Sequence, residues 1–212
     1  MSITKDPHAG QPVLASGSAP RAARLALILV HGRGASAEDI LGLAAELQLA
    51  DVACLAPQAA GQTWYPYSFL SPIEQNEPGI TSGLGVISRL IDDLGRDGLP
   101  PERIGLLGFS QGACLSLEFA ARNARRYAGV FALSGGLIGP PGTPRTYTGA
   151  FDGTPVFLGC SDVDSHIPLE RVHESTEVFR RMGAVVDERI YPRMGHTVNR
   201  DELDAVRNVL NR

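Results

Sequence analysis

The chain has 212 residues, of which 43% are hydrophobic and 20% charged, and its formal net charge is −4. These values are ordinary for a soluble globular protein, and the length suits one domain with a substantial core. The negative charge argues against nucleic acid or an anionic membrane surface as the main partner. No apolar run approaches the about 20 residues needed to span a bilayer, so we expect no stable membrane anchoring.

Residues 1–20 are polar and rich in Gly, Pro and Ser, which predicts a flexible N-terminal arm ahead of a single domain over residues 21–212. A short strand near Val13 and Leu14 is one alternative within this arm. The arm lacks the basic start, apolar stretch and cleavage site of a signal peptide, so we expect a cytoplasmic protein. The three cysteines lack metal-ligand spacing, and we expect no metal or cofactor site.

Apolar runs of strand length alternate with amphipathic helical patterns along the rest of the chain. Strands are expected over residues 25–30, 52–56, 104–108, 128–133, 156–159 and 184–191, and helices over 37–49, 79–95, 113–121, 168–182 and 201–210. This alternation predicts an α/β fold with a doubly wound, mostly parallel sheet flanked by helices. Ligands bind beyond the carboxyl ends of the strands in such sheets.

Two long segments, residues 58–78 and 137–153, interrupt the alternation. Four aromatic residues lie in the first: Trp64, Tyr65, Tyr67 and Phe69. A loop that covers the substrate face is one interpretation, and a surface loop that packs its own aromatic side chains together is the other. The second segment is rich in Gly, Pro and Thr, which predicts an irregular loop.

The most informative stretch is Gly108–Gly112, with the sequence Gly-Phe-Ser-Gln-Gly between a predicted strand and a predicted helix. A serine raised on a strained strand-to-helix turn needs small residues on both sides, and Gly108 and Gly112 meet that need. An ordinary glycine-rich turn can carry the same pentapeptide. The flanking elements, and an Asp and a His further along the chain, favour Ser110 as a nucleophile, with the N–H of Gln111 at a helix N-terminus beside it.

A serine hydroxyl needs an adjacent base, and the base needs a carboxylate to orient it. His196 follows the last predicted strand and is the natural base. Asp162 and Asp164 both follow the strand before it, and residue spacing alone leaves either as the carboxylate. The order Ser, Asp, His is that of α/β-hydrolases. The second oxyanion donor is expected from the loop after the first long strand, at the backbone N–H of Arg33.

These residues resemble the small phospholipase/carboxylesterase family of α/β-hydrolases, which includes the acyl-protein thioesterases. The matching stretches are L-I-L-V-H-G-R-G at 27–34, G-F-S-Q-G-A at 108–113, G-C-S-D-V-D-S-H-I-P at 159–168 and M-G-H at 194–196. In the family the carboxylate lies four residues before the proline of an Asp-x-x-[Val/Ile]-Pro turn. The resemblance therefore implies Asp164 as the carboxylate, and an α/β-hydrolase fold with a minimal cap.

The resemblance also implies hydrolysis of carboxylic esters without a cofactor. We expect a serine carboxylesterase acting on a small-molecule ester, with short to medium acyl chains, through an acyl-enzyme intermediate. The substrate would contact Trp64, Tyr65, Phe69 and His166. The alternatives are an acyl thioesterase or lysophospholipase, and a non-catalytic ligand-binding protein on the same fold. A homodimer is an open alternative for the oligomeric state.

Overall fold

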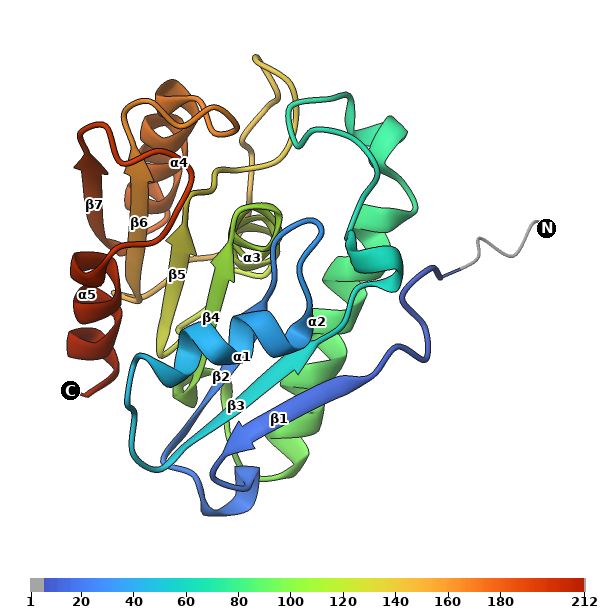
Figure 1. Cartoon of the computed structure of the whole chain (residues 1–212), viewed down its shortest axis with the longest axis vertical. Coiled ribbons are helices and arrows are strands. Elements are labelled where there is room, and N and C mark those ends of the chain that lie inside the picture. The colour runs from blue at the N-terminus through green and yellow to red at the C-terminus, as the bar shows by residue number, and fades with distance from the viewer. Residues whose placement is uncertain (1–5, 212) are drawn as a thin grey trace.

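A seven-stranded twisted sheet with helices on both faces is seen in the computed structural model, which describes residues 6–211 (Figure 1). The strands are β1 (Val13–Gly17), β2 (Leu25–Val30), β3 (Val52–Pro57), β4 (Ile104–Phe109), β5 (Gly129–Leu133), β6 (Pro155–Ser161) and β7 (Val185–Tyr191). The helices are α1 (Ala37–Ala45), α2 (Gly79–Arg96), α3 (Gln111–Arg122), α4 (Leu169–Arg181) and α5 (Arg200–Leu210).

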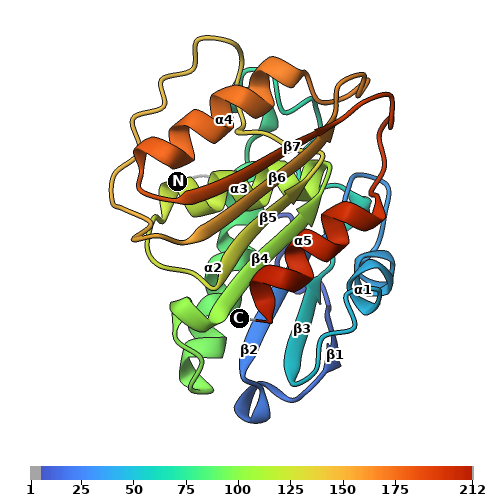
Figure 2. The same cartoon turned by 90° about the vertical axis from the view of Figure 1, so that its left-hand side faces the viewer.

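The strand order across the sheet is β1-β3-β2-β4-β5-β6-β7, and β1 alone among these strands runs antiparallel to its neighbour. Helices α1 and α5 cover one face of the sheet, while α2, α3 and α4 cover the other (Figure 2). This arrangement confirms the predicted doubly wound α/β fold. It also brings the carboxyl ends of β2, β4, β6 and β7 to one edge, where the loops with the predicted site residues begin.

The central strands are apolar because both of their faces are covered. Every residue of β2, Leu-Ala-Leu-Ile-Leu-Val, is buried, and β4 lies beside it in parallel register. Helix α1 begins where the sequence indicates, since Ser36 and Asp39 form a reciprocal capping box. It ends at Ala45, four residues before the predicted end, because the next residues form a tight turn and Gln48 adopts a positive φ of 50°.

Residues 6–20 form ordered contacts and not a flexible arm, and the alternative of a short strand near Val13 and Leu14 agrees with β1. Strand β1 pairs with β3, with Val13 opposite Pro57 and Gly17 opposite Ala53. His8 is also buried: its Nε2 donates to the carbonyl oxygen of Trp64 at 2.9 Å, and its Nδ1 accepts from the N–H of Ala60 at 3.1 Å. The edge of β3 offers unpaired backbone groups, and β1 satisfies them whatever its composition. Residues 1–5 of the predicted arm lie outside the described part of the chain.

Within residues 6–211, no helix combines the length and the hydropathy needed to cross a bilayer.

Candidate active site

Ser110 occupies the sharp turn between β4 and α3, with φ of 55° and ψ of −119°. The glycines on either side are needed because the backbones approach so closely. A Cβ atom on Gly108 would overlap the backbone of Gly112, and one on Gly112 would overlap the carbonyl of Val30. The strained serine conformation is therefore imposed by the crossing of strand and helix, and it raises the hydroxyl above the carboxyl edge of the sheet.

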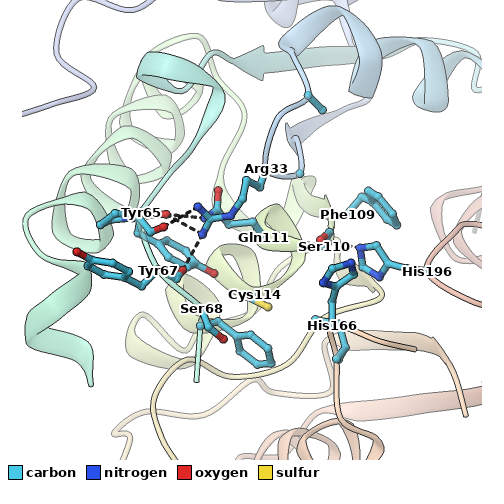
Figure 3. A pocket seen from close by; sticks show the side chains of 15 residues that line it. Arg33, Tyr65, Tyr67, Ser68, Phe109, Ser110, Gln111, Cys114, His166 and His196 are labelled. Atoms are coloured by element: carbon cyan, nitrogen blue, oxygen red, sulfur yellow. Dashed lines mark hydrogen bonds between the residues drawn. The ribbon is translucent and has the colours of Figure 1, made fainter. Parts of the chain in front are cut away.

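Three predicted side chains from separate loops form one hydrogen-bonded array. His196 Nε2 lies 2.8 Å from Ser110 Oγ, and His196 Nδ1 lies 2.7 Å from Asp164 Oδ2. Ser110 and His196 lie side by side at one wall of a cavity (Figure 3). The geometry is that of a nucleophile hydrogen-bonded to a base whose other nitrogen is held by a carboxylate.

The Asp164 side chain is fully buried and receives more than one hydrogen bond. Its Oδ1 accepts from the backbone N–H groups of His166 at 2.8 Å and Ile167 at 3.1 Å. Burial alone would raise the pKa of Asp164, but the bonds from His196 and from these two N–H groups outweigh it, so the pKa lies below its ordinary value. The carboxylate is therefore ionised and ready to orient the imidazole.

Asp162, the other candidate from the sequence, makes no hydrogen bond to the imidazole within the described part of the chain. It is exposed, and its Oδ1 accepts from the backbone N–H of Arg193 at 2.7 Å. That bond fixes the turn that leads from β7 to His196, in which Arg193 has a φ of 55°. The structure therefore gives the two carboxylates different neighbours: Asp164 contacts the ring, and Asp162 contacts the backbone of the loop that carries it.

The two expected oxyanion donors border the same cavity. Among residues 6–211, no protein acceptor pairs with the backbone N–H of Arg33 or of Gln111. The buried ring of His31 shapes the first of these loops, because its Nδ1 lies 2.8 Å from the carbonyl oxygen of Gly32 and its Nε2 accepts from the N–H of Ala59. Burial lowers the pKa of His31, which favours the neutral imidazole that donates at Nδ1 and accepts at Nε2.

The cavity beside Ser110 has a volume of about 410 Å³ (Figure 3). Its lining is mostly aromatic and apolar, and consists of Gly32, Arg33, Ala35, Tyr65, Pro66, Tyr67, Ser68, Phe69, Phe109, Ser110, Gln111, Cys114, His166, Ile167 and His196. The His166 ring stands edge-on to the His196 ring, with 4.7 Å between centroids. No Asp or Glu belongs to this lining set. The exposed side of the His196 ring therefore borders a mostly apolar cavity.

The structure places the aromatic residues of the first long loop in two settings. Tyr65, Tyr67 and Phe69 line the cavity, as expected of a substrate-facing loop. Trp64, which was also expected to contact substrate, is instead fully buried outside the lining, and its Nε1 donates to the carbonyl oxygen of His31 at 2.9 Å. Tyr65 is also buried, with 2% of its surface exposed, but it borders the cavity, whereas Trp64 does not.

Two groups that hold this loop were not identified from sequence. The Arg33 guanidinium donates to three backbone carbonyls, those of Tyr65, Pro66 and Tyr67, at 2.6 to 2.9 Å. The Gln111 side chain accepts from the N–H of Trp64 at 2.8 Å and donates to the Tyr65 carbonyl at 2.8 Å. The two residues that offer oxyanion N–H groups thus also fix the cavity wall with their side chains. The only sequence signal for these side-chain contacts is that both positions lie in stretches predicted to supply oxyanion N–H groups.

The other long loop, residues 137–153, is irregular as predicted and does not line the cavity. Arg171 holds its start by donating to the carbonyls of Leu137 at 2.7 Å and Gly139 at 2.6 Å. Cys114 is buried and also borders the cavity, and burial raises its pKa to about 12. Across the described residues, no group of three or more His, Cys, Asp or Glu side chains has the arrangement of a metal site.

Known proteins share this sequence pattern and fold. A crystal structure of a phospholipase/carboxylesterase from Dyadobacter fermentans is 40% identical, with a TM-score of 0.92 over 96% of this chain and 97% of that one. Acyl-protein thioesterase 1 of Eremothecium gossypii is 30% identical over 86% of this chain and 85% of that protein. Acyl-protein thioesterase 1 of Gibberella zeae is 35% identical, but the match spans 51% of this chain and 47% of that protein, about half of its length.

The sequence model of the phospholipase/carboxylesterase family matches residues 10–212, which is nearly the whole chain. This match agrees with the strand order, the strained serine turn and the structural likeness to the Dyadobacter protein. The chain therefore belongs to the phospholipase/carboxylesterase family.

Proposed function

We propose that the protein is a serine carboxylesterase that acts on small esters with short to medium acyl chains. The observation that carries the proposal is the hydrogen-bonded array of Ser110, His196 and Asp164, beside two backbone N–H groups that no other described residue accepts from. A cavity of about 410 Å³ supports a small substrate, since ligand pockets range over about 300–1,000 Å³.

In the proposed acylation step, Ser110 Oγ attacks the acyl carbonyl carbon while His196 Nε2 takes the hydroxyl proton. The carbonyl oxygen gains negative charge as the tetrahedral intermediate forms, and the N–H groups of Arg33 and Gln111 hold it. Asp164 keeps the imidazole in the tautomer that accepts at Nε2 and stabilises the imidazolium. His196 then returns the proton to the leaving alcohol, the carbon–oxygen bond breaks, and the acyl group stays on Ser110.

Deacylation repeats these steps with water as the nucleophile. His196 takes a proton from the water, which attacks the acyl carbon, and the same two N–H groups hold the second oxyanion. Collapse of this intermediate releases the carboxylic acid and returns the proton to Ser110. No step requires a metal or a cofactor. Tyr65, Phe69 and His166, which line the cavity, would contact the substrate and exclude water.

Thioester hydrolysis is the second candidate, because curated relatives at 30% and 35% identity are named acyl-protein thioesterases. The same array would cleave either bond, so the distinction lies in the relative rates. Matched oxygen and sulfur esters of one acyl group would decide it: a higher kcat/KM for the thioester would favour this candidate. Cytoplasmic location and a homodimer stay predictions.

The test is a rate series on p-nitrophenyl esters from acetyl to palmitoyl, with Ser110→Ala beside the wild type. We expect the highest kcat/KM at short to medium chains and loss of nearly all turnover in the variant. Ser116→Ala is a matched control and should keep its turnover. This buried serine lies in the second turn of α3 and does not line the cavity.

Turnover by a folded, pure Ser110→Ala protein would contradict the mechanism. A preference for long chains would favour the thioesterase or lysophospholipase alternative. Saturable binding without any turnover by the wild type would instead favour a ligand-binding protein on this fold.

A further inference from the structure

A second hollow adjoins the catalytic cavity and is not used in the mechanism above. It has a volume of about 360 Å³ and lies between helix α1 and the residues that follow His196. Its lining consists of His31, Gly32, Ala35, Asp39, Ile40, Leu43, Phe109, Thr197 and Val198, which we call the α1 groove. Three of these residues, Gly32, Ala35 and Phe109, also line the catalytic cavity, so the two hollows meet at this boundary.

In the proposed reaction, the acyl and alcohol parts of the substrate extend to different sides of Ser110. The leaving oxygen must lie near His196, because that ring delivers its proton. The oxyanion lies at the N–H groups of Arg33 and Gln111. The acyl group is left to extend toward the wall that carries Tyr65 and Tyr67, which lies across the cavity from His196 (Figure 3).

The α1 groove lies on the His196 side. Thr197 and Val198 continue the chain directly from the base, and the Phe109 ring at the boundary packs against the His196 ring with 5.0 Å between centroids. A group attached to the leaving oxygen therefore has a short path over Phe109 into the groove. The catalytic cavity and the groove together can hold both halves of one ester.

The chemistry of the groove indicates which alcohols it suits. Ile40, Leu43, Phe109 and Val198 give it an apolar surface. Asp39 supplies the ionised side chain of the lining set, and its carboxylate is already engaged by the N–H of Ser36 at 2.8 Å and by its hydroxyl at 2.9 Å. An alkyl or aryl group would be favoured there, whereas a phosphate-bearing group would meet a negative charge without a cation.

We propose that the α1 groove binds the alcohol part of the substrate, and that Leu43 and Val198 set the preference among alcohols. The proposal rests on the proposed esterase function. It assigns esters of apolar alcohols as the substrate class.

The test compares methyl, propyl, butyl and hexyl acetates. All four form the same acetyl-enzyme on Ser110, so differences in kcat/KM report on the alcohol alone. We expect kcat/KM to rise with alcohol length by up to about fourfold per methylene, the gain for burying a CH₂ group. Leu43→Gln should lower the hexyl-to-methyl ratio by about tenfold, and Val198→Thr should lower it in the same direction.

The control variant is Leu41→Gln, which makes the same change at a partly buried leucine of α1 that lines neither hollow. It should keep the wild-type ratio. The acyl-length series on p-nitrophenyl esters should keep its slope in Leu43→Gln, because that series varies the other half of the substrate.

A wild-type ratio that does not rise with alcohol length would overturn the proposal. So would an unchanged ratio in both Leu43→Gln and Val198→Thr, or an equal fall in Leu41→Gln. Failure of the esterase function itself would look different, since no acetate would then be hydrolysed in a Ser110-dependent way.

Discussion

Asp164 Oδ2 and His196 Nδ1 lie 2.7 Å apart, although 32 residues separate them in the chain. The pair depends on two loops that leave neighbouring parallel strands, β6 and β7, at the same edge. Each partner is fixed by its own loop as well: Asp164 by two backbone N–H groups, and the His196 turn by the bond from Gly195 N–H to Ser161 Oγ at 3.1 Å. The imidazole is thus oriented before any substrate binds.

Replacing Asp164 with Asn should lower kcat by about 10⁴, as in serine proteases, because the amide favours the wrong imidazole tautomer. Asp162→Asn is the matched control: its Oδ1 can still accept from Arg193, so its activity should stay close to wild type. Both variants would be assayed on one p-nitrophenyl ester with thermal unfolding in parallel. The opposite ranking would assign the carboxylate role to Asp162.

The glycines of the serine turn make a second prediction. Gly112→Ala should cost about 3 kcal/mol or more in unfolding free energy, because its Cβ would overlap the backbone carbonyls of Val30 and His31. Displacement of Ser110 should also lower kcat/KM by about 100-fold. Gly42→Ala, in α1, has no atom within 4 Å of its Cβ and should stabilise the protein by about 0.5–1 kcal/mol. Chemical denaturation of both variants checks this, and equal effects would contradict it.

The sequence predicted the α/β order, the serine turn and the histidine because each leaves a local signal: strand-length apolar runs, paired glycines, and a histidine just past a strand. The edge strand was predicted only as an alternative, near Val13 and Leu14, because β1 is held by its partner β3 and not by its own composition. Trp64 was misplaced for a related reason. Its neighbour Tyr65 is also aromatic and also buried, and residue type alone does not show which of the two borders the cavity.

The choice between Asp162 and Asp164 shows the same limit. Both follow β6 within the same loop, and residue chemistry alone is identical for the two. The decisive contacts come from the β7 loop, which supplies a ring to one carboxylate and a backbone N–H to the other. Family spacing pointed to Asp164, and physical reasoning on single residues could not.

Glu202 provides a pH-dependent test of stability away from the site. It is fully buried in the first turn of α5, where its Oε2 accepts from the Asn199 N–H at 2.8 Å, while its Oε1 has no partner among the described residues. Burial raises the pKa of Glu202 from 4.5 to about 7. The folded state therefore binds more protons than the unfolded state between these two values.

The contribution of Glu202 to the free energy of unfolding is therefore most favourable below pH 4.5. It is lost as the pH rises through about 7, and the full loss is about 3 kcal/mol. Glu202→Gln keeps an oxygen for the Asn199 cap but carries no charge, so its stability relative to wild type should increase from pH 5 to pH 8 and then level off. Urea unfolding of both proteins across this range measures the difference. A difference that stays constant with pH would mean that the Glu202 carboxyl is ionised at its ordinary pKa in the folded protein.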